Sequence, residues 1–340
     1  MKKLLNLIIC TAFVFSVLLC ISAPAFALDN NDSMMEVLKY VVLDDGTAEI
    51  SYYDSLNTHF SIPEAVDGYT VTSIGKKAFK GCHVLKSVTI PDTVTAINNQ
   101  AFDQCQALKT VSVGKNVKTI GYKAFSECKA LTTINIPDGV TTIGNNAFIK
   151  CFNLGSITIP SSVESIGNYA FSDCINLSNV TIGNGKVSIG EFAFGWCLSL
   201  KSLTLDSNLS SISCNAFVAC DSLESITIKS KDCAIYNDAG TLPDCAVIYG
   251  YYGSTAHSYA ETYNRKFVML DEITDYIKGD TDGDKKVTVM DATDIQRANA
   301  SYITFTATQE KAADVDDDQK VTIMDATKIQ RYIAQDIKEL

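Results

Sequence analysis

SIGNYAFSDCINLSNVTI, at residues 165–182, is one copy of a phrase that the chain repeats seven times between Ile74 and Ile228. The copies share an Ala-Phe pair, a cysteine and a leucine, all at a step of 23 residues. The pairs begin at Ala78, Ala101, Ala124, Ala147, Ala170, Ala193 and Ala216, and the cysteines are Cys82, Cys105, Cys128, Cys151, Cys174, Cys197 and Cys220. A fixed period in the twenties is typical of a solenoid, in which each unit buries its apolar face against its neighbours.

Within each repeat the apolar spacing changes from that of a strand to that of a helix. Leu131, Ile134 and Ile136 are spaced as a short strand that faces inward and ends at Pro137. The residues from Ala147 to Leu154 then recur at helical spacing. We therefore expect an α/β solenoid with a parallel β-sheet on one face and short helical turns on the other.

The repeated phrase resembles the BspA-like leucine-rich repeat over roughly residues 60–270. The resemblance implies a secreted or cell-surface binding solenoid rather than an enzyme. Fourteen small polar residues occupy the outward strand positions: Ser87, Thr89, Thr110, Ser112, Thr133, Asn135, Ser156, Thr158, Asn179, Thr181, Ser202, Thr204, Ser225 and Thr227. They suit an exposed sheet, and the alternative is a binding platform for an unknown protein or glycan.

Segments without the repeat flank the solenoid at residues 74–228. Residues 28–73 are expected to form an N-terminal cap and partial repeat, with a hairpin of Val37–Leu43 and Ala48–Tyr53. Residues 229–270 are similar to the C-terminal cap of this repeat family, with a helix at Ser254–Tyr263 and a strand at Lys266–Leu270. Residues 271–278 are a predicted linker.

Residues 1–27 have the pattern of a signal peptide. A Lys-Lys start, an apolar run and Ala25-Phe26-Ala27 fit export and cleavage, and the alternative is a retained membrane anchor. No other segment is long and apolar enough to span a bilayer, so we expect a secreted, extracellular chain without membrane insertion after cleavage. The formal net charge of −11 argues against nucleic acid as a partner.

Twelve cysteines in a secreted chain suggest disulfides, but their regular spacing favours another interpretation. Seven recur once per repeat, and stacked coils would hold their side chains parallel, whereas a disulfide needs opposed sulfurs. Buried free thiols that act as small apolar spacers are therefore expected. Cys233 and Cys245 lie outside this series, and a disulfide between them is an open alternative.

The last 60 residues contain a second repeat with a step of 34. VTVMDATDIQR at 287–297 and VTIMDATKIQR at 321–331 match at nine of eleven positions, and an acidic twelve-residue loop overlaps the start of each. Carboxylates at loop positions 1, 3, 5 and 12 are the oxygen ligands that Ca²⁺ requires. The predicted ligands are Asp280, Asp282, Asp284 and Asp291 in the first loop, and Asp314, Asp316, Asp318 and Asp325 in the second.

Other loop positions complete the expected cages for two calcium ions. Position 7 would offer backbone carbonyls of Lys286 and Lys320, and position 9 offers Thr288 and Thr322, directly or through water. Position 6, usually glycine, holds Lys285 and Gln319, so we expect backbone strain there.

Paired loops of this kind are similar to a type I dockerin module, which we place at residues 279–340. The resemblance implies a small all-α domain with two EF-hand-like calcium loops that docks onto a cohesin domain of a scaffold protein. Because the two copies are nearly identical, the resemblance also implies docking in two orientations related by 180°. By resemblance the contact residues are Val289, Met290, Gln296, Arg297, Ile323, Met324, Gln330 and Arg331. The alternative for Met290 and Met324 is the domain core.

Three functions follow from these features. The first is a non-catalytic component of a cellulosome- or amylosome-like polysaccharide-degrading complex, held at the cell surface through a scaffold. The second is a dockerin-borne glycoside hydrolase, although none of His59, His83 and His257 lies in a catalytic-looking constellation of the sequence. The third is a free adhesin or inhibitor.

Overall fold

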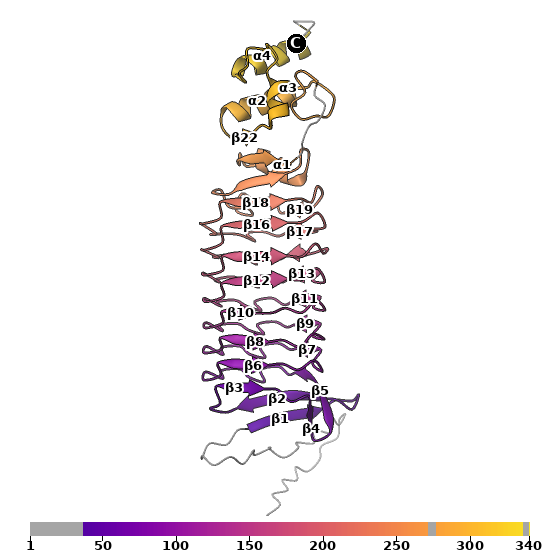
Figure 1. The fold of residues 1–340 in the computed structure, drawn as a ribbon, viewed down its shortest axis with the longest axis vertical. Coiled ribbons are helices and arrows are strands. Elements are labelled where there is room, and N and C mark those ends of the chain that lie inside the picture. The colour runs from indigo at the N-terminus through magenta and orange to yellow at the C-terminus, as the bar shows by residue number, and fades with distance from the viewer. Residues whose placement is uncertain (1–36, 271–276, 336–339) are drawn as a thin grey trace, which may run out of the picture.

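The computed structural model describes residues 37–270, 277–335 and 340. The predicted signal peptide, the start of the predicted N-terminal cap and most of the predicted linker lie outside these residues. The described chain forms a rod of stacked coils with a small helical domain at its C-terminal end (Figure 1). No helix among the described residues has the length and apolar character needed to cross a membrane.

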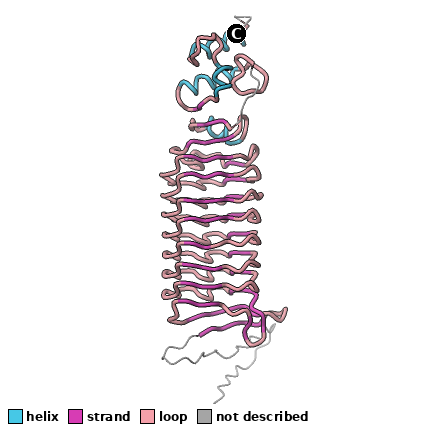
Figure 2. Tube along the Cα trace, in the orientation of Figure 1, coloured by secondary structure: helices cyan, strands magenta, loops and turns pink. Residues whose placement is uncertain are grey.

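Each coil contributes one strand to each of two columns (Figures 1 and 2). The first column contains β6 (Ser87–Thr89), β8 (Thr110–Ser112), β10 (Thr133–Ile134), β12 (Ser156–Ile159), β14 (Asn179–Ile182), β16 (Ser202–Leu205) and β18 (Ser225–Ile228). The second contains β5 (Tyr69–Ile74), β7 (Ala96–Ile97), β9 (Thr119–Ile120), β11 (Thr142–Ile143), β13 (Ser165–Ile166), β15 (Ser188–Ile189), β17 (Ser211–Ile212) and β19 (Ala234–Ile235). Only the first column was expected as a sheet, but the second forms the longer continuous one.

The predicted helical turns are single hydrogen-bonded turns rather than a helix. Amides of Ala147, Cys151 and Leu154 each donate to the carbonyl three residues earlier. Asn146 and Lys150 have φ values of 59° and 60°, and such left-handed residues interrupt any helix. The amide of Phe148 instead donates to the carbonyl of Ala170 in the next coil at 2.7 Å, so the turns also join the coils together.

A column of stacked phenylalanine rings fills the core of the rod. The seven rings of the Ala-Phe pairs are fully buried, and neighbouring centroids lie 4.8 to 5.6 Å apart.

The ten described cysteines are free, as expected for the repeated ones, and Cys233 and Cys245 are not paired with each other.

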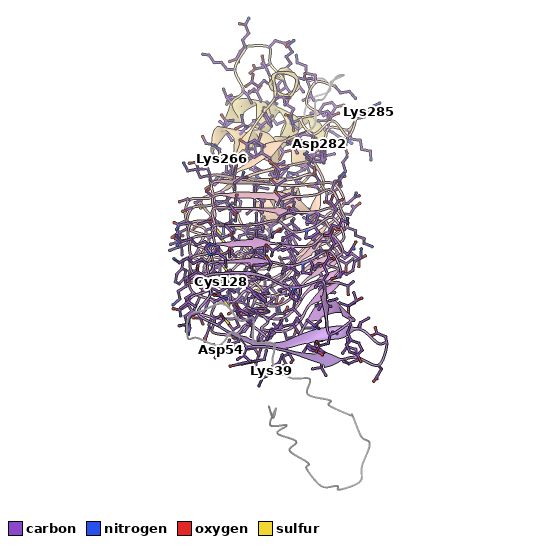
Figure 3. The ribbon with its side chains drawn as sticks, turned by 60° about the horizontal axis from the view of Figure 1, so that its bottom comes forward. Lys39, Asp54, Cys128, Lys266, Asp282 and Lys285 are labelled. Atoms are coloured by element: carbon purple, nitrogen blue, oxygen red, sulfur yellow. The ribbon has the colours of Figure 1, made fainter. Side chains whose placement is uncertain are left out.

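The seven repeated thiols do more than fill space, because each donates to a backbone carbonyl of the preceding coil. The Sγ atom of Cys151 lies 3.2 Å from the carbonyl oxygen of Phe125, and that of Cys128 lies 3.2 Å from the carbonyl of Phe102. The same bond recurs along the rod, and Figure 3 labels Cys128 within it. Each repeated thiol therefore fills space in the core and also donates a hydrogen bond to a buried backbone carbonyl.

The N-terminal end of the rod is covered by the predicted hairpin. Strands β1 (Val37–Val42) and β2 (Ala48–Asp54) pair antiparallel, and β2 pairs parallel with β5. The short strands β3 (His59–Ser61) and β4 (Ala65–Val66) pair with β6 and β5. The hairpin occupies the sheet edge that the first coil would otherwise expose.

The C-terminal end has the predicted strand and helix. It consists of β20 (Val247–Gly250), α1 (Thr255–Thr262) and β21 (Phe267–Met269), and Ser254 caps α1 by accepting from the amide of His257. The helical domain follows, with α2 (Val289–Asn299), β22 (Ile303–Thr304), α3 (Ala307–Ala313) and α4 (Ile323–Ile333). Strand β22 pairs parallel with β21, so the helical domain extends the solenoid sheet by one strand. The sequence did not predict this junction.

Candidate calcium and docking site

Each acidic loop brings three of its four predicted carboxylates together. Ligand atoms of Asp280, Asp282 and Asp291 lie within 4.8 Å of one another, and the same holds for Asp314, Asp316 and Asp325. The position 5 residues, Asp284 and Asp318, are exposed and lie outside these groups. Three convergent carboxylates per loop form the start of an oxygen cage for a hard cation.

Hydrogen bonds from the backbone shape the start of each loop. The Oδ1 atom of Asp280 accepts from the Gly283 amide at 2.6 Å, and its Oδ2 atom accepts from the Lys285 amide at 2.9 Å. In the second loop Asp314 accepts from the amides of Asp318 and Gln319 at 3.1 and 2.9 Å. The first aspartate therefore folds its loop around one side of the cluster.

The last aspartate of each loop joins the loop to the helix that follows. Asp291 accepts from the Thr281 amide with Oδ1 and from the Thr288 amide with Oδ2, both at 2.7 Å. Asp325 accepts in the same way from the amides of Val315 and Thr322, at 2.9 and 2.8 Å. This arrangement fixes the beginning of α2 and α4 directly beside the carboxylate clusters.

The threonines at position 9 act as helix N-caps. The Oγ1 atom of Thr288 accepts from the Met290 amide at 3.1 Å, and Thr322 accepts from the Met324 amide at the same distance. At the position where the sequence predicted a calcium contact, each threonine hydroxyl therefore already accepts a hydrogen bond from its helix. The residues at position 7, Lys286 and Lys320, have exposed side chains, and their amides donate to the position 5 aspartates at 2.8 Å.

The expected strain at position 6 is present in both loops. Lys285 has a φ of 68° and Gln319 a φ of 64°, in the left-handed region that favours glycine. Because the two loops differ in sequence at this position but share its conformation, the loop geometry imposes the strain.

The two loops differ in their surroundings. Asp280 and Asp282 are 1% and 8% exposed, and the hydroxyl of Tyr252 in the solenoid cap donates to Asp282. Burial raises the pKa of Asp282 and of Asp291 above the usual range. The second loop faces solvent, with Asp316 and Asp318 exposed. Figure 3 labels Asp282 and Lys285 at this end of the rod.

The donor sets fit calcium. Among the described residues, no predicted ligand forms an ion pair with a lysine or arginine side chain, so the clustered negative charge has no nearby protein counter-ion. A bound divalent cation would supply that charge, and the residues that would hold it are the six clustered aspartates.

Four large apolar side chains beside the loops are exposed. Val289, Met290, Ile323 and Met324 are 56%, 40%, 53% and 64% exposed, so the two methionines are not part of the domain core. That core consists of Ala292, Ile295, Ala313, Val315, Ala326 and Ile329. Exposed apolar residues with a polar rim are typical of an interface.

The polar residues of the predicted docking face are not equivalent. Gln296, Gln330 and Arg331 are exposed. Arg297 differs from the expectation, because its side chain is only 12% exposed and its Nη1 atom lies 2.9 Å from Oε1 of Glu261 in α1. The solenoid cap engages Arg297 because β22 pairs with β21, which brings α2 against α1.

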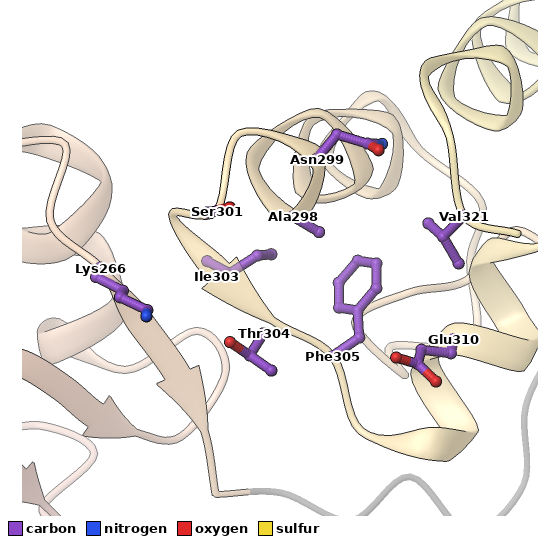
Figure 4. Close-up of a pocket in the computed structure, with 9 residues that line it drawn as sticks. All are labelled: Lys266, Ala298, Asn299, Ser301, Ile303, Thr304, Phe305, Glu310 and Val321. Atoms are coloured by element: carbon purple, nitrogen blue, oxygen red, sulfur yellow. The ribbon is translucent and has the colours of Figure 1, made fainter.

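A pocket of about 340 Å³ lies where the helical domain meets the solenoid (Figure 4). Phe305, Val321 and Ile303 supply its apolar lining, Lys266 approaches from just before β21, and Glu310 is the one carboxylate among the lining residues. A sugar-cleaving site of the usual kind needs two carboxylates across the bond, and this pocket does not have them.

A surface aromatic cluster on the solenoid was not identified from the sequence. The ring centroids of Tyr169 and Phe192 are 4.8 Å apart, and those of Phe192 and Trp196 are 5.8 Å apart. Trp196 is 39% exposed. The repeat alignment could have predicted this cluster. Tyr169 and Phe192 occupy the same position in neighbouring repeats, and the other copies have lysine, glutamine or asparagine there.

The fold and the paired acidic loops define a repeat protein with a docking module. The family model for the BspA type leucine rich repeat region matches residues 48–178 and 141–239, which together cover more than half of the chain. The chain therefore belongs to the BspA-type leucine-rich repeat family. Residues 278–334 match the dockerin type I domain, so the C-terminal domain is a type I dockerin. Such domains bind calcium, and their presence implies binding to a cohesin.

Solved structures similar to this chain are bacterial leucine-rich repeat proteins. One is the leucine rich repeat protein of T. pallidum, at 22% identity and a TM-score of 0.49, covering 68% of this chain and 94% of that one. Another, from Bacteroides ovatus, has 24% identity and a TM-score of 0.35, covering 72% and 80%. A third, from Bacteroides capillosus, has 31% identity and a TM-score of 0.32, covering 43% and 93%. No curated protein matched the chain.

Proposed function

We propose that this chain is a secreted, non-catalytic binding protein that its dockerin attaches to a cohesin of an extracellular scaffold. The observation that carries the proposal is a pair of exposed apolar dipeptides, Val289-Met290 and Ile323-Met324, in the first turns of α2 and α4. Each dipeptide lies directly before the last aspartate of a carboxylate cluster. Two calcium ions would therefore hold both dipeptides in place.

The link between metal and docking face is short. Asp291 fixes the Thr288 amide and belongs to the cluster, while Thr288 caps the helix that carries Met290. Without a cation, the repulsion of the clustered carboxylates acts on the same residues that begin the helix. Calcium removal should therefore loosen the docking face before it affects the solenoid.

A cohesin pull-down tests the proposal. The chain without its predicted signal peptide is mixed with cohesins from scaffolds of polysaccharide-degrading bacteria, in calcium and after chelation. We expect capture in calcium only, and loss of capture when Asp280→Ala and Asp314→Ala are combined. A matched control is Asp317→Ala, an exposed loop aspartate outside the clusters, which should still bind. Failure of every cohesin to bind would leave a free adhesin or inhibitor as the better interpretation.

The solenoid would then be the part of the molecule that the scaffold displays. Its first strand column presents the polar positions, of which most are exposed, and Trp196 with its neighbours adds an aromatic surface elsewhere on the rod. Aromatic anchors are typical of protein and sugar contacts. Binding of the chain to glycan arrays and to bacterial surface proteins, compared with Trp196→Ala, tests whether this cluster contributes.

The alternative is a dockerin-borne glycoside hydrolase. The pocket at the junction has one carboxylate, and the solenoid core is filled by stacked phenylalanines. These features favour binding over hydrolysis. Release of reducing sugar from a panel of polysaccharides, with turnover proportional to protein concentration, would support the enzyme instead and contradict the proposal. A cellulosome- or amylosome-like complex is the setting we propose for either activity.

A further inference from the structure

A second cluster of ligand-type side chains lies at the junction between the solenoid cap and the dockerin. His257 and Glu261 are one turn apart on α1, and Asp294 approaches from α2. Ligand atoms of the three residues lie within 4.8 Å of one another, and the Nε2 atom of His257 is 3.8 Å from Oε1 of Glu261. His257 is 3% exposed and Asp294 is fully buried.

The buried polar atoms of this cluster lack partners. The Nε2 atom of His257 and both carboxylate oxygens of Asp294 have no hydrogen bond. An unpaired buried carboxylate costs several kcal/mol, on the order of the effective penalty for a buried ion. Burial raises the pKa of Asp294 to about 8 and lowers that of His257 to about 4. The imidazole is thus neutral at neutral pH and able to act as a ligand.

The local charges leave room for a cation. Arg297 lies beside the cluster and pairs with one oxygen of Glu261 at 2.9 Å. Arg297 balances the charge of Glu261, whereas burial and the nearby carboxylates keep Asp294 largely protonated at neutral pH, so a bound cation would take the place of its proton. A carboxylate has two oxygens, so Glu261 can contact Arg297 and a metal at the same time.

We propose that His257, Glu261 and Asp294 bind a divalent transition-metal ion of the Zn²⁺ type at the solenoid–dockerin junction. One imidazole and two carboxylates are ligands that suit Zn²⁺, whereas Ca²⁺ prefers oxygen alone. The ligand atoms must approach one another by up to about 1.5 Å, since tetrahedral ligands about 2 Å from zinc lie about 3.3 Å apart. Binding through Nε2 requires the proton on Nδ1, which gives up only a 3.3 Å bond from the Gly253 amide.

The site would connect the solenoid cap with the dockerin, which also meet at the β21–β22 pairing and the Arg297–Glu261 ion pair. Two of its ligands come from the cap and one from the dockerin, next to the β21–β22 pairing. A metal there would hold the dockerin in a fixed direction relative to the rod. It would also be independent of the cohesin, because the ligands lie on the solenoid side of α2.

Zinc titration of calcium-saturated protein tests the site. The chain without its predicted signal peptide is stripped of metals, saturated with calcium and titrated with Zn²⁺ in a calorimeter, and Co²⁺ is used for visible absorption. We expect one saturable zinc per chain and a cobalt spectrum with nitrogen and oxygen ligation. His257→Ala and Asp294→Asn should each weaken zinc binding at least about tenfold. His59→Ala and His83→Ala, exposed histidines outside the cluster, should retain it.

The outcomes separate the site from the fold. Calcium stoichiometry of each variant shows that the dockerin is intact, and a variant that fails this control is replaced by Glu261→Gln. Absence of saturable zinc binding in the wild-type chain, or unchanged affinity in either ligand variant, would overturn the proposal. The cobalt spectrum of the wild-type chain decides the matter without any substitution, since a spectrum identical to aqueous Co²⁺ also overturns it.

Discussion

Arg297 on α2 donates from Nη1 to Oε1 of Glu261 on α1 across 2.9 Å, whereas its repeat equivalent Arg331 on α4 is exposed. The nearly identical sequences of the two dockerin halves therefore do not produce two equivalent faces. The half that carries α2 contacts the solenoid cap through Arg297, whereas Arg331 in the half that carries α4 is exposed. A cohesin that could use either face of an isolated dockerin would meet different surfaces in this chain.

We accordingly expect cohesin binding in the full chain to depend on the second half. Combining Met324→Ala with Gln330→Ala should cost about 2 kcal/mol or more, as expected when interface anchors are removed. The matched pair Met290→Ala with Gln296→Ala should cost less than about 1 kcal/mol. The affinity of each double variant for a cohesin that binds the wild-type chain is measured by calorimetry and compared. Equal losses would show that the solenoid does not select a face.

Tyr252 should tune the first calcium loop alone. Its hydroxyl donates to Asp282, and such outer partners orient carboxylate ligands. Tyr252→Phe should weaken calcium binding at the first loop by about 10-fold or more. In the second loop, Asp314, Asp316 and Asp318 accept from backbone amides, so calcium binding there should be unaffected. Calcium calorimetry resolves the two sites, with Tyr263→Phe as the control, since that hydroxyl donates to Asn237 instead.

Glycine at loop position 6 should stabilise the dockerin. Gln319 has a φ of 64°, and a left-handed residue other than glycine costs about 1–2 kcal/mol, part of which is offset by the greater chain entropy of unfolded glycine. Gln319→Gly should therefore raise stability by roughly 0.5–1 kcal/mol in chemical denaturation of the calcium-bound chain. Lys320→Gly, at the neighbouring position, does not have this strain to relieve and should lower stability. The opposite order would mean that the loop does not store the strain.

The sequence predicted the parts of the structure that follow a period. The 23-residue step determined which side of each first-column strand faces inward, and the aspartates at fixed loop positions predicted which carboxylates converge. The sequence allowed Met290 and Met324 to lie either in the core or on the surface, and in the structure alanines and isoleucines of α2 and α4 fill the core instead. Periodicity alone does not distinguish these alternatives.

The remaining features depend on short or aperiodic segments. Second-column strands such as Thr142–Ile143 are two residues long, too short for alternation to identify. The left-handed turn positions hold side chains of many kinds, such as Lys150, Asp173 and Trp196, and only Gly81 among them is glycine, so residue type did not predict these turns. The pairing of β22 with β21 brings His257 close to Asp294. It joins two different repeats whose periods are unrelated, so no sequence spacing predicted it.

The phenylalanine column should dominate solenoid stability. Phe148 is fully buried, with its ring centroid 5.3 Å from that of Phe125 and 5.1 Å from that of Phe171. Phe148→Ala removes contacts with both neighbouring coils and should cost about 3–5 kcal/mol. Tyr122→Ala, an aromatic truncation at a side chain that is 41% exposed, should cost less than about 1 kcal/mol. Denaturant unfolding of both variants measures the difference, and a small loss at Phe148 would show that the coils repack.

The buried thiols should make the solenoid sensitive to alkaline pH. Burial raises the pKa of five thiols that the rod encloses: Cys105, Cys128, Cys151, Cys174 and Cys197. In the unfolded chain these thiols ionise near pH 8.5, whereas the folded chain keeps them protonated. Above that pH the unfolded state therefore binds fewer protons than the folded state, and the free energy of unfolding falls as pH rises.

Each enclosed thiol should contribute a slope of up to about 1.4 kcal/mol per pH unit between its unfolded and folded pKa values. Cys151→Ser removes one such thiol while keeping a donor near the carbonyl of Phe125, so its stability should decline less steeply than that of the wild type. Ile143→Val lowers stability by about 0.5–1.5 kcal/mol and leaves the thiols in place, so its slope should equal that of the wild type. Denaturant unfolding in reductant from about pH 8 to pH 10 gives the slopes, and lysine and tyrosine titration cancels between variants. A slope for Cys151→Ser equal to that of the wild type would show that the thiol ionises in the folded rod, contrary to its burial.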